Sequence, residues 1–166
     1  MESKAKLLGH PVHQMLIVFP LGLLATGVVF DIIYLASGTR GFAGVAYWLI
    51  LSGIVGGLLA APFGLIDWAA IPGGTRAKRI GAMHGLGNTV VLALFIVSEI
   101  LRSPAPADAP AIAYVCSFVG AALALVTAWL GGELVDRLGI GVYANAGVDA
   151  PSSLSRTSQP RSARAA

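Results

Sequence analysis

The chain has 166 residues, of which 56% are hydrophobic and only 11% are charged, and its mean hydropathy is +0.79. A soluble domain carries about 25% charged residues, so 11 basic and 8 acidic side chains are too few to cover a soluble surface. The 21 glycines agree with this, because glycine is more frequent in membrane helices than in soluble ones. The composition therefore excludes a soluble protein and indicates one integral membrane domain.

Four apolar stretches follow one another along the chain. A bilayer core about 30 Å thick requires roughly 20 mostly apolar residues per helix, and the stretches that meet this length are about 12–36, 45–66, 80–101 and 111–132. Loops rich in glycine or proline separate them. We expect an all-α, antiparallel four-helix transmembrane domain over 12–143, after an N-terminal segment 1–11. The tail 144–166 is rich in Ala, Ser, Pro and Arg and is predicted to be disordered.

The distribution of basic residues in the loops predicts the orientation of the spans. One side of the membrane receives nine Lys and Arg residues: Lys4, Lys6, Arg76, Lys78, Arg79, Arg137, Arg156, Arg161 and Arg164. The other side receives Arg40 and Arg102. Because basic loops stay on the cytoplasmic side, we expect both termini and the middle loop in the cytoplasm.

Backbone signals within the spans indicate how the helices bend and pack. Pro20 has no N–H group, so it should free the carbonyl of Leu16 and kink the first helix. Small residues four apart allow helix backbones to approach closely in lipid. The sequence offers three such pairs: Gly53 with Gly57, Gly81 with Gly85, and Gly120 with Ala124.

The few polar residues in or beside the spans fall at two predicted depths. Charged side chains in a membrane usually face the bundle interior or water, so these positions are candidates for a site. The predicted inner cluster contains His10, His13, Asp67, His84, Asn88 and Glu133. The predicted outer level contains the two carboxylates Asp31 and Glu99, because 18 residues of helix from His13 rise about 27 Å.

The two halves of the chain share this polar pattern. Each half has a histidine, then an acid, then a second acid: His13, Asp31 and Asp67 in the first, and His84, Glu99 and Glu133 in the second. Two such halves of equal orientation can be related by an axis along the membrane normal. This interpretation predicts that His13 faces His84 across the bundle. The alternative is that any four-helix protein has polar residues at its helix ends.

Two segments resemble the signatures of a known family. They are Gly9-His-Pro-Val-His-Gln-Met-Leu-Ile-Val-Phe-Pro-Leu-Gly22 with Asp31, and Gly64-Leu-Ile-Asp-Trp68 with Ile71-Pro72, Arg76-Ala77, Gly81-Ala-Met-His84 and Asn88. They are similar to a bacterial membrane family catalogued as domain of unknown function 2231. The resemblance implies a four-helix membrane fold, and some relatives accompany redox modules. We expect the chain to lie in the bacterial inner membrane. This chain differs at Gln14, where a second proline is common, and at Val18, where relatives often carry another histidine.

Three classes of function remain open from the sequence. In the first, His13 and His84 bind a metal or a haem, such as haem b, because two imidazoles at equal depth can be axial ligands of one iron. Asp67 and Glu133 could then orient the imidazole rings. The alternative is that the histidines anchor the helices at the membrane interface by hydrogen bonds to Asp67, Glu133 or lipid. In the second, the inner cluster and the outer carboxylates are the two ends of a path for protons or a small solute.

The third class is a non-catalytic membrane partner or accessory subunit, either alone or as a homo-oligomer. In this interpretation Arg76, Lys78 and Arg79 contact anionic lipid, and the acids form structural ion pairs. The expected pairs are Asp67 with Arg76 or Arg79, and Glu133 with Arg137. The sequence has no phosphate-binding loop and no nucleophile motif, so an independent enzyme is not expected. The basic tail is too sparse for nucleic-acid binding.

Overall fold

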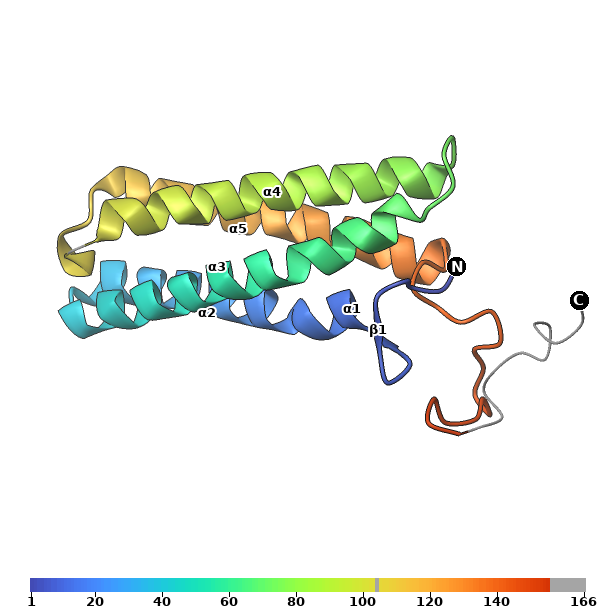
Figure 1. Cartoon of the computed structure of the whole chain (residues 1–166). Coiled ribbons are helices and arrows are strands. Elements are labelled where there is room, and N and C mark those ends of the chain that lie inside the picture. Colours follow the sequence, from blue (N-terminus) through green and yellow to red (C-terminus); the bar gives the residue numbers. More distant parts are fainter. Residues whose placement is uncertain (104, 156–166) are drawn as a thin grey trace, which may run out of the picture.

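The structure, a computed structural model, describes residues 1–103 and 105–155 (Figure 1). Its helical elements in chain order are α1 (Val12–Leu16), α2 (Val18–Ser37), α3 (Arg40–Ala69), α4 (Arg76–Arg102), η1 (Pro106–Asp108), α5 (Ala111–Gly132) and η2 (Glu133–Arg137). In the described part, four segments are long and apolar enough to cross a membrane: 12–37, 40–69, 76–102 and 111–137. The predicted all-α four-helix membrane fold is therefore confirmed.

The helices pack as two antiparallel hairpins, α2 with α3 and α4 with α5 (Figure 1). The N-terminus and the α3–α4 connection lie at one end of the bundle, which we call the terminal end. The α2–α3 and α4–α5 connections lie at the opposite end, which we call the far end. Because the hairpins are local units, the bundle depends on contacts that join one hairpin to the other.

The chain segments outside the helices gather at the terminal end. The strands β1 (Lys6–Leu7) and β2 (His10–Pro11) form a short antiparallel hairpin. The Tyr143 hydroxyl donates to the Gly9 carbonyl at 2.6 Å, and the amino group of Met1 donates to the Gly139 carbonyl at 2.7 Å. Residues 144–155 form successive hydrogen-bonded turns. Arg156, Arg161, Arg164 and the rest of the tail predicted to be disordered lie outside the described residues.

The helices extend beyond the predicted apolar spans because polar residues continue them. α3 begins at Arg40, and α4 begins at Arg76 after Thr75, whose hydroxyl accepts a hydrogen bond from the Lys78 N–H at 3.1 Å. A side-chain cap of this kind satisfies one of the free N–H groups at a helix start. The apolar run alone therefore underestimates helix length.

The first span is interrupted where Pro20 predicts a kink. α1 ends at Leu16 and α2 begins at Val18, so the irregular turn is at Ile17, one turn before the proline. Proline cannot donate to the Leu16 carbonyl, and the regular pattern resumes with the Leu21 N–H donating to Ile17 at 3.1 Å. The break separates His13 from the long straight part of the span.

Glycines permit close packing both within the hairpins and between them. A Cβ atom on Gly53 would lie 2.7 Å from Leu24, and one on Gly57 would lie 2.7 Å from Leu92 of the other hairpin. Phe95 and Ile50 are fully buried in the core between the hairpins. Gly85, by contrast, has no described atom within 4 Å of its Cβ position, so it does not serve as a packing glycine.

Candidate functional site: a histidine pair at the terminal end

The two histidines predicted to face each other are neighbours in the structure. His13 lies on α1 and His84 on α4, with ring centroids 6.4 Å apart and ring planes at 87°. His13 Nδ1 lies 3.0 Å from the Ala60 carbonyl oxygen, and His84 Nδ1 lies 2.9 Å from the Thr127 carbonyl oxygen. Each histidine is thus held by a main-chain carbonyl of the other helix in its own half.

These contacts fix the tautomer of both rings. A carbonyl oxygen only accepts hydrogen bonds, so Nδ1 of each ring carries the hydrogen. In the neutral ring this leaves a lone pair on Nε2. Within residues 1–103 and 105–155, His13 Nε2 has no hydrogen-bond partner. His84 Nε2 lies 3.2 Å from Asn88 Nδ2, which also donates to the His84 carbonyl at 3.0 Å.

Each ring packs against a glycine one helical turn beyond its carbonyl partner. A Cβ atom on Gly64, four residues after Ala60, would lie 2.8 Å from His13. A Cβ atom on Gly131, four residues after Thr127, would lie 3.2 Å from His84. The repeat seen in the sequence therefore extends to these contacts: a histidine, a carbonyl and a glycine in each half.

The donor set distinguishes between two kinds of metal centre. A bare ion such as Zn²⁺ needs three or four protein ligands, and among the described residues no group of three His, Cys, Asp or Glu side chains could hold one. Haem iron already has four porphyrin nitrogens and takes only axial ligands from the protein. Two neutral imidazoles on different helices match that requirement.

The remaining members of the predicted inner cluster make other contacts. The Asp67 carboxylate accepts from the Ser3 hydroxyl at 2.8 Å and from the Lys4 N–H at 2.7 Å. Glu133 forms an ion pair with Arg76 at 2.7 Å. Neither acid orients an imidazole, and the pairs expected for Asp67 with Arg76 or Arg79 and for Glu133 with Arg137 are not the ones formed. The Ser153 hydroxyl lies 3.4 Å from His10, outside the bundle.

Two of the three basic residues expected to contact lipid are engaged with protein. Arg76 pairs with Glu133, and Lys78 Nζ lies 4.0 Å from the ring centroid of Trp68 and donates to its carbonyl at 2.7 Å. The Trp68 indole N–H donates to the Lys78 carbonyl at 3.1 Å. These reciprocal hydrogen bonds hold the two ends of the α3–α4 connection together. Arg79 has no ion pair in the described part of the chain.

The far end contains a fully buried ion pair that sequence reasoning missed. Arg102, assigned to a loop from the sequence, is the last residue of α4 and is 0% exposed, as is Asp31 of α2. Its guanidinium donates to both carboxylate oxygens of Asp31, at 2.6 and 2.7 Å. Ser98 accepts from Arg102 Nε at 3.0 Å, and the Ser117 hydroxyl donates to Asp31 at 3.2 Å. The sequence signal for this network was the four-residue spacing of Ser98 and Arg102, which places both side chains on one face of a helix.

The second predicted outer carboxylate, Glu99, is not part of this hydrogen-bond network. It lies on α4 and is 6% exposed, and neither side-chain oxygen has a hydrogen-bond partner among the described residues. Asp31 and Glu99 do share the far end, as predicted, but only Asp31 has a counter-charge bonded to it.

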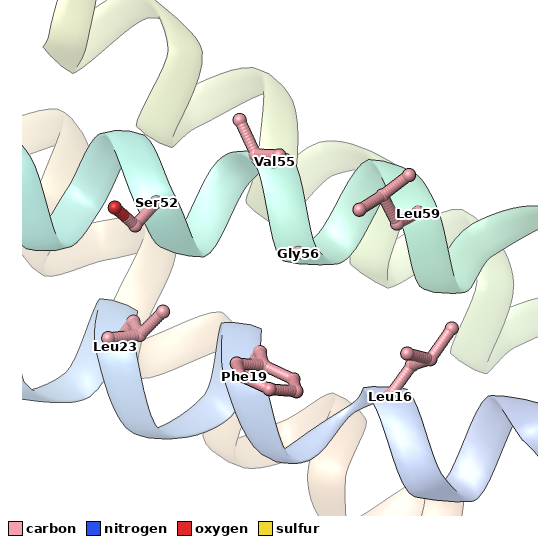
Figure 2. Close-up of a pocket in the computed structure, with 7 residues that line it drawn as sticks. All are labelled: Leu16, Phe19, Leu23, Ser52, Val55, Gly56 and Leu59. Carbon is pink, nitrogen blue, oxygen red and sulfur yellow. The ribbon is translucent and has the colours of Figure 1, made fainter.

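An apolar groove of about 480 Å³ lies between the first span and α3, beside the helix break (Figure 2). Figure 2 shows Leu16 and Phe19 on either side of the interruption, with Ser52 and Gly56 on the facing helix. The remaining lining residues, Leu23, Val55 and Leu59, are aliphatic. The groove contains no titratable or ligating side chain, so the chemistry of the molecule lies at its two ends.

Comparison with known families identifies the chain. It matches the family DUF2231, described as a predicted membrane protein, over residues 9–144. No curated protein and no solved structure matches it. The matched region includes all four spans together with the histidine pair and the buried ion pair. The chain therefore belongs to the DUF2231 family of membrane proteins.

Proposed function

We propose that this member of the DUF2231 family is a haem-binding membrane protein for electron transfer, with His13 and His84 as the axial ligands. The observation that supports this is the pairing of two Nδ1-anchored imidazoles whose centroids are 6.4 Å apart. Metal–imidazole bonds are about 2.0–2.1 Å long, so two such ligands on opposite sides of one ion have ring centres about 6 Å apart. The separation fits a shared iron.

The surrounding residues support such a site without direct ligation. The carbonyls of Ala60 and Thr127 hold Nδ1–H, the usual orientation device for a ligating imidazole. Gly64 and Gly131 leave room for the rings against α3 and α5. Asn88 keeps its hydrogen bond to the His84 carbonyl when Nε2 is given to a ligand. When bound, the haem iron would be the group that carries one electron.

The decisive experiment is a visible spectrum of the full chain expressed with ample haem and purified in mild detergent. We expect a Soret band that shifts on reduction, and we expect His13→Ala and His84→Ala each to abolish the six-coordinate spectrum. His10→Ala is the matched control, because His10 lies outside the bundle, and it should leave the spectrum unchanged.

Asn88→Ala gives a second control inside the site. It removes the amide that contacts His84 Nε2 but leaves the Thr127 carbonyl contact, so haem content should stay at the wild-type level. Colourless, metal-free protein from haem-replete cells would exclude the proposal. Copper without haem in the same preparation would also exclude the proposal, because the two histidines would then bind a single copper ion in place of a haem iron.

The protein would work beside a partner, since haem in a bundle without catalytic groups can only receive and donate electrons. We further propose that it lies in the bacterial inner membrane with both termini in the cytoplasm, which the basic residues near the terminal end favour. A fluorescent-protein fusion after residue 155 should fluoresce, and alkaline phosphatase inserted at residue 39 should be active. The reverse pattern of activities would show that the termini lie on the opposite side of the membrane.

A further inference from the structure

The far end of the bundle holds a carboxyl group that neither the proposed haem site nor the ion pair uses. Glu99 is 6% exposed, and both of its oxygens are without a hydrogen-bond partner in the described residues. It lies fifteen residues beyond His84 on the same helix, about 22 Å along the axis. Its role is therefore separate from that of the histidine pair.

An ionised carboxylate in this position is strongly unfavourable. Moving an isolated charge from water into an apolar interior costs far more than a protein can supply, and such a group becomes neutral or acquires a partner. The nearby cation, Arg102, already gives two hydrogen bonds to Asp31. With the arginine committed, the neutral, protonated form is the one that Glu99 can adopt.

Because Arg102 lies on the same helix as Glu99, its guanidinium has a second carboxylate that it can pair with. Residues three apart on a helix are neighbours, so Arg102 lies within reach of Glu99 as well as Asp31. The guanidinium can compensate only one of the two carboxylates with paired hydrogen bonds. Loss of a proton from Glu99 therefore creates competition between α4 and α2 for the same cation.

We propose that Glu99 is a proton-binding site inside the bundle, and that Arg102 exchanges from Asp31 to Glu99 when this proton leaves to solvent. Proton release thus loosens the link between the two hairpins at the far end, and proton binding restores it. The described elements packed around this end carry these other titratable groups: Tyr34 on α2, Arg40 and Tyr47 on α3, Asp108 on η1, and Tyr114 and Cys116 on α5. Arg40 and Asp108 pair with each other at the exposed rim.

The test uses a lipophilic carbodiimide, dicyclohexylcarbodiimide, on the full chain in detergent near neutral pH. The acid adds across one N=C bond of the reagent, the carboxyl proton moves to nitrogen, and no atom is lost. We expect the mass of one whole reagent on the peptide that contains Glu99, with no adduct in Glu99→Gln. Glu133→Gln is the matched control and should label like wild type, because Glu133 is ion-paired with Arg76.

Asp31→Asn tests the exchange of Arg102. The substitution removes the competing carboxylate, so Arg102 should pair with Glu99 and labelling of Glu99 should be lost in protein that remains folded. A carboxylic-acid carbonyl band in the infrared spectrum, present in wild type and absent from both Glu99→Gln and Asp31→Asn, gives an independent measure. Failure of Glu99 to label in native protein, while unfolded protein labels, overturns the proton site. Unchanged labelling in Asp31→Asn overturns the exchange.

Discussion

The two ends of the bundle bring the same two hairpins together by different chemistry. The far end joins α2 to α4 by a full ion pair, Asp31 with Arg102, buried completely and bonded through both oxygens. The terminal end brings α1 and α4 together through His13 and His84, whose hydrogen bonds run to carbonyls within their own halves. At the far end the charges of Asp31 and Arg102 compensate each other. At the terminal end His13 Nε2 has no hydrogen-bond partner among the described residues and is available to a ligand.

The residues that stabilise the bundle and the residues able to bind a ligand lie at opposite ends. A buried ion pair with satisfied hydrogen bonds has no reason to take a ligand, and its loss leaves an uncompensated charge. A histidine whose Nε2 has no hydrogen-bond partner among the described residues, as in His13, is still able to bind a ligand.

The largest effect is expected from Arg102→Met, which leaves Asp31 buried without a cation. Breaking a buried pair by removing one partner costs about 3–5 kcal/mol, and thermal unfolding in detergent should show the loss. Asp31→Leu combined with Arg102→Met removes both charges and should recover most of it. Arg40→Met is the exposed control, with little expected change. Equal losses in the two arginine variants would show that burial does not decide the cost.

At the terminal end, the largest effect should come from Gly64→Ala. The new Cβ would lie 2.8 Å from the ring of His13, and overpacking of this kind costs about 1–3 kcal/mol. We expect a lower unfolding temperature and reduced haem content. Gly131→Ala should be milder, because its closest ring contact is 3.2 Å. Gly85→Ala has open space and is the matched control. A Gly85 effect equal to that of Gly64 would contradict the steric explanation.

Single hydroxyl groups allow a direct comparison of the two ends. Ser117→Ala removes a donor to Asp31 and an acceptor for Arg102, and Thr127→Val removes the donor to Asn88. Thr127→Val should cost about 1 kcal/mol of stability, the usual net contribution of a hydrogen bond between neutral groups. We expect Ser117→Ala to cost more, since its partners are charged. Thr127→Val keeps the carbonyl that holds His84, so it should leave haem content at the wild-type level, as expected for Asn88→Ala. A spectral change in Ser117→Ala would argue against separate ends.

The smallest effect concerns the exposed pair between Arg40 and Asp108. The hydrogen bond from Arg40 lowers the pKa of Asp108 below its ordinary value of 3.8. A lowered pKa in the folded state contributes stability above the ordinary pKa, and that stability is lost as pH falls through the folded value. Asp108→Asn should therefore slightly lower the unfolding temperature at pH 7 and leave it unchanged in strong acid. High salt should reduce the difference in unfolding temperature. A difference that grows as the pH falls would contradict the predicted direction of the pH dependence.

Much of the fold could be predicted because a membrane span is a local property. Twenty apolar residues are sufficient to indicate a helix across a bilayer, and the proline in the first span indicated its interruption. The approach of His13 to His84 followed from equal depth and the repeated pattern. Their partners could not be predicted in this way, because main-chain carbonyls are present at every residue and have no sequence signal.

Composition and spacing are sufficient to predict the four spans, their antiparallel order and the two levels of polar residues. Which of these residues bind each other follows only from the packing of the helices. Arg102 follows an apolar run and resembles a loop residue until helix packing brings it to Asp31, 71 residues away in the chain. Among the described residues Glu99 has no hydrogen-bond partner for the same reason, since one arginine compensates one carboxylate. Pairing between distant residues depends on how helices pack, and composition and spacing do not contain that information.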